Sequence, residues 1–161
     1  MEIERKYLIK EMPENISEYE HHEISQGYVD TDPVVRIRRY DDNFILTIKS
    51  RGLLERIEIE KDLNQEEFDQ LSQMVQGNLI EKTRYIIPYN GLKLEIDEFH
   101  GIFEGLKYGE VEFDDIESSK NFTPPDYMFM DVTEEPRFQN SSLSQMNEEE
   151  IQQMLSSILH Y

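Results

Sequence analysis

Hydrophobic and polar residues alternate with a period of two in seven short segments of the chain. Such alternation is typical of β-strands, because successive side chains of a strand point to opposite faces. Turn-forming residues, Asp41-Asp42-Asn43 and Asn90-Gly91, separate two pairs of these segments, and the second turn is a strong hairpin signal. The sequence therefore predicts an antiparallel, strand-rich meander. The predicted strands are Glu2–Ile9, Val34–Tyr40, Asn43–Ser50, Glu55–Glu60, Lys82–Tyr89, Leu92–Phe99 and Gly109–Phe113.

Capping residues and a spacing of 3.6 residues predict two helices. The first begins after Asn64 and ends before Gly77, and a terminal helix begins after Asn147. A short helical turn is expected over Ser118–Phe122, ended by Pro124-Pro125. The apolar stripes consist of Phe68, Leu71, Met74 and Val75 in the first helix and of Ile151, Met154, Leu155 and Ile158 in the terminal one.

Ionisable residues occupy one face of each predicted strand. A solvated outer face would explain any one strand, but it does not explain why some strands carry only carboxylates and others only cations. We therefore expect two clusters, one suited to a divalent metal ion and one suited to a polyanion. The faces contain Glu2, Glu4 and Lys6; Arg36 and Arg38; Thr47 and Lys49; Glu58 and Glu60; Lys82 and Arg84; Lys93, Glu95 and Asp97; and Glu110 and Glu112.

A closed or nearly closed antiparallel barrel would bring these charged faces together in its lumen. The apolar faces would then point outward, under the helices. Such a lumen costs stability, because each buried charge must be paired or hydrated. It would form a wet, ion-lined cavity that suits a polyphosphate.

Composition narrows the choice of partners. Of the 161 residues, 16 are Lys or Arg and 35 are Asp or Glu, which gives a net charge of −19 with neutral histidines. An acidic surface repels nucleic acid and anionic lipid, so we expect neither nucleic acid nor a membrane as a partner. The chain has no cysteine, no apolar segment of membrane-spanning length and a charged beginning unlike a signal peptide. We expect one cytoplasmic domain over residues 1–161.

The chain opens with Glu2-Ile3-Glu4-Arg5-Lys6, an ExExK pattern, and eight further motifs follow. They are QGYV at 26–29, VRIR at 35–38, LTIKS at 46–50, ERIEIE at 55–60, EKTRY at 81–85, LEIDEF at 94–99, GEVEF at 109–113 and DVTEEPRFQNSSL at 131–143. In this order, the motifs resemble those of the CYTH proteins, the triphosphate tunnel metalloenzymes. One departure is Phe138, which stands where the family often has Tyr.

The resemblance implies an α+β fold, an eight-stranded antiparallel β-barrel with a charged lumen, flanked by a few helices. It also implies a divalent cation, Mg²⁺ or Mn²⁺, and a small triphosphate substrate, most closely as in the inorganic triphosphatases that release pyrophosphate and phosphate. The residues that match the family's metal-binding carboxylates are Glu2, Glu4, Glu110 and Glu112, with Asp97 assisting. Those that match its phosphate-binding cations are Arg36, Arg38, Lys49, Lys82 and Arg84, and Lys6 and Tyr28 match a catalytic pair.

In the expected reaction, the carboxylates and the triphosphate share a metal ion. A second metal site, or Glu112 acting through a bound water, activates the nucleophile. Two neighbouring glutamates favour the charged form of Lys6, so we expect this lysine to position the attacking water rather than to remove its proton. Strand parity places Glu58 and Glu60 in the tunnel, but the sequence assigns no role to Glu58, Glu60, Glu95 or Arg137.

Three functions remain open at this point. The first is hydrolysis of inorganic triphosphate, with thiamine or nucleoside triphosphates as variant substrates. The second is an adenylate cyclase, which would need a purine pocket that no residue identifies. The third is a non-catalytic polyphosphate-binding module, which would tolerate the loss of a metal carboxylate. Metal preference and oligomeric state, a homodimer included, are also left open.

The histidines do not suggest a metal site. His21 and His22 are adjacent in sequence, so in a strand they would point to opposite faces. We expect both to be exposed to solvent. His100 precedes Gly101 and is expected in a surface loop.

Overall fold

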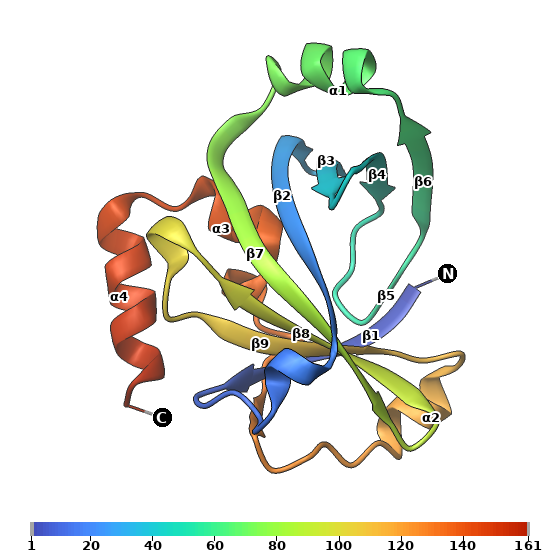
Figure 1. Ribbon diagram of the computed structural model, residues 1–161, viewed down its shortest axis with the longest axis vertical. Coiled ribbons are helices and arrows are strands. Elements are labelled where there is room, and N and C mark those ends of the chain that lie inside the picture. Colours follow the sequence, from blue (N-terminus) through green and yellow to red (C-terminus); the bar gives the residue numbers. More distant parts are fainter. Residues whose placement is uncertain (1, 161) are drawn as a thin grey trace.

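The computed structural model describes residues 2–160, which form one ten-stranded sheet, four α-helices and three short 3-10 helices (Figure 1). The strands are β1 (Glu2–Ile9), β2 (Glu20–Thr31), β3 (Val34–Tyr40), β4 (Asn43–Lys49), β5 (Glu55–Arg56), β6 (Glu58–Leu63), β7 (Gln76–Tyr89), β8 (Leu92–Phe99), β9 (Lys107–Glu112) and β10 (Met128–Asp131). The helices are η1 (Ile16–Glu18), α1 (Gln65–Ser72), η2 (Gly101–Phe103), α2 (Ile116–Lys120), η3 (Pro136–Phe138), α3 (Asn140–Gln145) and α4 (Glu148–Ile158).

The sheet curls into a nearly closed barrel, which confirms the predicted fold class (Figure 1). Neighbouring strands follow the order β6-β4-β3-β2-β7-β8-β9-β1, and β5 pairs with β1 to form a seam. This seam contains two residue pairs, Glu2 with Arg56 and Ile3 with Glu55. Because only Ile57 separates β5 from β6, the two act as one interrupted strand, and the barrel has eight strands. The short β10 pairs with the second half of β1.

Two strands and the beginning of a third were not predicted. β2 carries polar residues on both faces, for example Gln26, which accepts a hydrogen bond from the cavity-lining Arg38, and Ser25 on the opposite face, so no apolar and polar alternation marks it. β10 is only four residues long. β7 begins at Gln76, next to Gly77, which has a positive φ and lies so close to the Ser144 carbonyl that a Cβ would clash with it. This glycine therefore allows α3 to approach the strand rather than ending the first helix.

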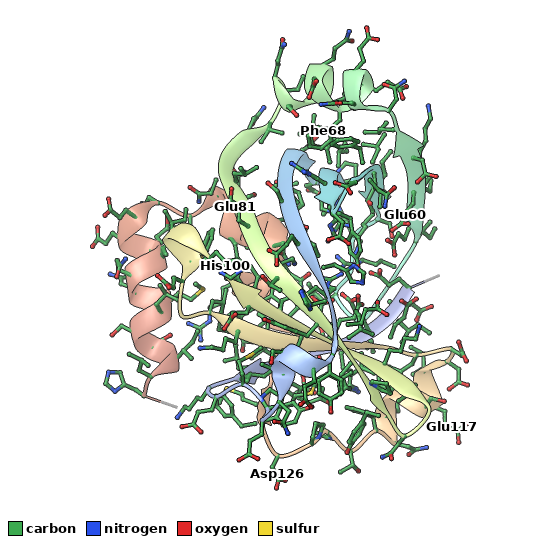
Figure 2. The ribbon with its side chains drawn as sticks, in the orientation of Figure 1. Glu60, Phe68, Glu81, His100, Glu117 and Asp126 are labelled. Atoms are coloured by element: carbon green, nitrogen blue, oxygen red, sulfur yellow. The ribbon has the colours of Figure 1, made fainter. Side chains whose placement is uncertain are left out.

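The predicted helices are present, with shifted bounds in two cases. Asn64 caps α1, which ends at Ser72, and Phe68 packs on Phe44 beneath it with 4.7 Å between ring centroids (Figure 2). Asn147 caps α4 as expected, and the buried face of α4 includes the predicted stripe. α2 begins two residues before the predicted turn, and α3 was not predicted.

Two apolar clusters form the core. One packs α3 and α4 against the barrel and includes Leu143, Ile151 and Met154. The other covers the outer faces of β1, β8 and β9 and includes Ile3, Leu94, Ile96, Val111 and Phe113. Apolar faces thus point outward over these strands, as expected, whereas Ile57 and Ile59 beside the seam stay 59% and 60% exposed. Within residues 2–160, no helix combines the length and the apolar character needed to cross a membrane.

The two adjacent histidines point to opposite faces, as the sequence predicts, but only one is fully exposed. His21 is exposed and lies against Tyr85, whereas His22 is half-buried against Tyr40. The ring of His22 is hydrogen-bonded to Glu20 and to Asp41, each at 2.6 Å. The expectation of solvent exposure is therefore wrong for His22, because the β3–β4 turn folds back onto it. His100 is also half-buried, with Nε2 2.7 Å from the Thr83 hydroxyl.

We expect His22 to stabilise the fold only at low pH. Although its partial burial acts in the opposite direction, the hydrogen bonds to Glu20 and Asp41 raise the pKa of His22 above 6.5. Its contribution to stability is then fully present below pH 6.5 and is lost as the pH rises through the folded-state pKa. His22→Gln should lower Tm by roughly 2 °C at low pH and leave it unchanged at high pH. His21→Gln is the control, and an equal loss at both pH values would contradict the prediction.

Candidate functional site

The barrel encloses a cavity of about 640 Å³. Side chains project into the space between β2, β3, β4 and β6 (Figure 2). Among residues 2–160, six Lys or Arg and seven Glu side chains line the cavity, so it is nearly neutral although the chain carries −19. The cations are Lys6, Arg36, Arg38, Lys49, Arg56 and Arg84, and the carboxylates are Glu2, Glu4, Glu58, Glu60, Glu95, Glu110 and Glu112.

The two signs of charge lie on different arcs of the barrel wall. The adjacent strands β4, β3, β2 and β7 supply four cations and the neutral Tyr28. The adjacent strands β8, β9, β1 and the interrupted strand β5–β6 supply all seven carboxylates. Two cations, Lys6 and Arg56, stand within this acidic arc. The lumen therefore presents a cationic wall opposite an acidic wall, which is the segregation that strand parity predicted.

Ion pairs across the seam hold the acidic wall. Glu2 contacts Lys49 of β4 at 3.1 Å and Arg56 of β5 at 3.0 Å. Arg56 also contacts Glu4 at 3.1 Å. All four side chains are about nine-tenths buried. One arginine thus forms ion pairs with two carboxylates of the same strand.

The charged and hydrogen-bonding neighbours of these buried carboxylates separate their pKa values. Burial and the nearby carboxylates of Glu110 and Glu2 raise the pKa of Glu4 to about 8. Glu2 behaves in the opposite way: although burial opposes the change, a hydrogen bond from Glu58 and the charges of Lys49 and Arg56 lower its pKa to about 2. Burial and the hydrogen bond to Glu2 raise the pKa of Glu58 to about 8. The acidic wall therefore holds more carboxyl groups than the local cations can neutralise.

Lys6 and Tyr28, the expected catalytic pair, both line the cavity. The Lys6 ammonium donates to the Phe138 carbonyl at 3.0 Å, lies 3.5 Å from Glu110 and stands 4.4 Å from the ring centre of Tyr108. Tyr28 is 2% exposed, and burial raises the pKa of its phenol. The Phe138 ring is buried in the core, so this segment reaches Lys6 through its backbone rather than through a side-chain hydroxyl.

The cationic wall has unfilled capacity for an anion. Arg36 donates to Thr47 at 3.2 Å, but its buried Nε has no hydrogen-bond partner within residues 2–160. Arg38 donates to the neutral amide of Gln26 at 2.8 Å. Burial, together with the cations Arg36 and Arg84, lowers the pKa of Arg38 to about 9. A bound anion would accept a hydrogen bond from the unpaired Nε of Arg36. It would also reduce the electrostatic repulsion among these guanidinium groups.

Two predicted site residues lie beneath the cavity rather than on its surface. Lys82 and Asp97 are fully buried and contact each other at 2.8 Å. Asp97 also accepts two hydrogen bonds from Arg84, at 2.8 and 2.9 Å. In this arrangement, Lys82 and Asp97 support Arg84, which does line the cavity.

Sequence reasoning missed several lining residues. Arg56 shares strand parity with Glu58 and Glu60, and this signal could have identified it. Gln139, Asn140 and Ser141 also line the cavity, and although they belong to the DVTEEPRFQNSSL motif at 131–143, no strand parity assigned them to the lumen. They come from the beginning of α3, and only the tertiary structure brings them to the barrel.

The donor set of the acidic wall fits a divalent cation. Hard cations take carboxylate oxygens, and Glu2, Glu4 and Glu110 supply these close together. The raised pKa of Glu4 indicates that this site has room for more positive charge. In the part of the chain that the structure describes, no three carboxylate or histidine side chains are already arranged as a ligand set. A metal ion would therefore replace some of the present lysine and arginine partners.

We expect Arg56 to be essential for the stability of the barrel in the absence of metal. Arg56→Met should lower the free energy of unfolding by about 3 kcal/mol, because it leaves the buried carboxylate of Glu4 without its ion-pair partner and that of Glu2 with Lys49 alone. Urea unfolding measures this difference. Arg51→Met is the matched control, since Arg51 pairs with Asp32 in solvent and its loss should leave stability nearly unchanged. Equal stabilities of the two variants would show that the seam does not depend on these ion pairs.

Known proteins share this sequence and this architecture. Residues 1–125 match the CYTH domain. An inorganic triphosphatase of Nitrosomonas europaea is 34% identical over 148 residues, which cover 89% of this chain and 96% of the relative. One of Acetivibrio thermocellus is 36% identical over 122 residues, covering 73% and 77% of the two chains. A crystal structure of an inorganic triphosphatase is similar with a TM-score of 0.68 at 31% identity, covering 91% of this chain and 96% of that one. The chain therefore belongs to the CYTH domain family.

Proposed function

We propose that this protein is a divalent-metal-dependent triphosphatase that hydrolyses inorganic triphosphate to pyrophosphate and phosphate. The observation that carries the proposal is the pair of opposed walls in one cavity, with cations on β4, β3 and β7 and carboxylates on β8, β9, β1 and β6. A polyphosphate needs cations along its length, and a divalent cation needs carboxylate oxygens beside it. The names of the two relatives as inorganic triphosphatases support this substrate.

The cationic wall would hold the substrate. Arg36, Arg38 and Arg84 present guanidinium groups, which suit phosphate oxygens because two parallel donors can bind two oxygens. Lys49 adds a further cation beside Glu2. Held in this way, the phosphate chain would be fixed in line for displacement of its terminal group.

The acidic wall would hold the metal. We assign Glu2, Glu4, Glu110 and Glu112 as its ligands, because they line the cavity next to one another on the paired strands β1 and β9. When bound, Mg²⁺ or Mn²⁺ neutralises charge on the phosphates and lowers the pKa of a bound water. Asp97 is buried beneath this wall, and we assign it to orienting Arg84.

Lys6 and Tyr28 would act on the attacking water. The Lys6 ammonium lies beside Glu110 and donates to the Phe138 carbonyl, and these contacts suit it to positioning the water. Burial raises the pKa of the Tyr28 phenol, so it can donate a hydrogen bond at neutral pH.

We infer that residues 126–160 belong to the same domain, because Phe138 and α3 complete this end of the cavity.

A phosphate-release assay tests the proposed function. The purified protein is given inorganic triphosphate, thiamine triphosphate or ATP with Mg²⁺ or Mn²⁺, and cyclic AMP is measured in parallel. We expect phosphate from inorganic triphosphate only when metal is present, and Glu4→Gln should reduce its rate about 100-fold or more. Glu98→Gln is the control, on the outward face of β8. Cyclic AMP from ATP, or no turnover of any substrate, would overturn the proposal.

We expect Arg36 to contribute mainly to substrate binding. Arg36→Ala should raise KM for triphosphate roughly 10- to 100-fold, because a charged hydrogen bond to phosphate is lost. Arg39→Ala is the matched control, because Arg39 lies on the same strand, β3, but is exposed to solvent. Steady-state kinetics separate KM from kcat. An unchanged KM for Arg36→Ala would remove this residue from the phosphate site.

A further inference from the structure

One end of the cavity is closed by the beginning of α3. Asn140, the first residue of that helix, lines the cavity together with its neighbours Gln139 and Ser141. These residues lie beyond residue 125, where the match to the CYTH domain ends, and within the DVTEEPRFQNSSL motif at 131–143. The chain therefore adds a polar group to the cavity from a segment far away in sequence.

The side chain of Asn140 makes three hydrogen bonds to the barrel. Its Oδ1 accepts from Lys82 Nζ and from Gln26 Nε2, both at 3.1 Å, and its Nδ2 donates to Tyr108 Oη at 2.7 Å. The orientation of the amide follows from its partners, because an ammonium group can only donate. The three partners come from β7, β2 and β9, so one amide joins three strands.

The first arm of this network leads to Arg38. The Gln26 side chain donates to Asn140 through Nε2, and this hydrogen bond turns Gln26 Oε1 towards Arg38. Gln26 Oε1 then accepts from Arg38 Nε at 2.8 Å. Gln26 is 1% exposed, so water does not compete for these bonds. The direction of the Arg38 guanidinium therefore depends on how Gln26 is held.

The second arm leads to Arg84. Lys82 Nζ lies between Asn140 Oδ1 at 3.1 Å and Asp97 Oδ2 at 2.8 Å. Asp97 in turn accepts both hydrogen bonds from Arg84. Because Lys82 and Asp97 are completely buried, a shift of the Lys82 ammonium would be passed to the guanidinium of Arg84.

We propose that Asn140 is a positioning residue that fixes the directions of Arg38 and Arg84 in the cavity. The proposal rests on the proposed function, in which these two arginines hold phosphate. An amide is suited to the role, since it accepts from two donors and donates to a third group without adding charge to the lumen. In this way, the hydrogen bonds of the Asn140 amide, rather than the docking of α3 as a whole, would set the directions of the phosphate-binding cations.

The kinetic test compares two substitutions of Asn140. Asn140→Leu keeps a similar volume but removes all three hydrogen bonds, and we expect kcat/KM for triphosphate to fall about 10- to 100-fold, mainly through KM. Asn140→Asp keeps oxygens that accept from Lys82 and Gln26, and it should recover most of this loss. If Asn140→Leu does not fold, Gln26→Leu tests the first arm alone and should raise KM with α3 in place.

Asn78→Leu is the matched control for simple docking of α3. Asn78 donates to the Leu143 and Met146 carbonyls, at 3.0 and 2.7 Å, and thus anchors α3 without lining the cavity. This variant should lower Tm and keep kcat/KM. If it loses as much activity as Asn140→Leu, the role of Asn140 is only structural and the proposal is overturned.

A measurement without substrate separates this proposal from the proposed function. Nitrogen-detected NMR of the unliganded protein reports hydrogen exchange at Arg38 Nε, which donates to Gln26. We expect exchange roughly 10-fold faster in Asn140→Leu than in the wild type or in Asn78→Leu. Unchanged exchange in Asn140→Leu would overturn the positioning role. A wild type that fails to hydrolyse triphosphate would overturn only the proposed function.

Discussion

The barrel depends on the ion pairs that close its seam. Within residues 2–160, two residue pairs join β1 to β5 and the Glu4 N–H donates to the Leu54 carbonyl at 3.2 Å, so few backbone hydrogen bonds close the barrel at this point. Glu2 compensates for this by binding Lys49 of β4 and Arg56 of β5 together. Buried charges are costly unless they are paired, and the same pairs that neutralise the lumen also close it. Stability and the charged lumen are therefore consequences of one set of contacts.

A charged lumen moves the hydrophobic core to the outside of the barrel. Where helices or β10 cover the strands, outward-facing residues such as Leu94 and Val111 become fully buried. The segment after residue 125 is part of this solution, because Leu143 and Ile151 pack against the barrel end while the beginning of α3 lines the cavity. The outer face beside the seam has no such cover, and Ile57 and Ile59 stay exposed there.

Two of the four carboxylates assigned to the metal, Glu2 and Glu4, also hold the barrel together. Arg56 is shared by Glu2 and Glu4, and burial with neighbouring carboxylates raises the pKa of Glu4 to about 8. Added positive charge would therefore be favourable at Glu4, and an added anion would be favourable at the unpartnered Nε of Arg36. A metal ion at the acidic wall would add this positive charge, and a triphosphate at the cationic wall would supply the anion.

The sequence alone determined which residues face the lumen, because side chains along a strand alternate by geometry. Glu4, Arg36 and Glu110 follow from this rule, and so does the segregation of charge between strands. This alternation does not tell how deeply a side chain is buried, and only the tertiary structure placed Lys82 beneath the cavity surface. β2 escaped prediction because both of its faces are polar, and Asn140 because its position depends on where α3 docks. Such placements arise from contacts between residues distant in sequence, which no local pattern encodes.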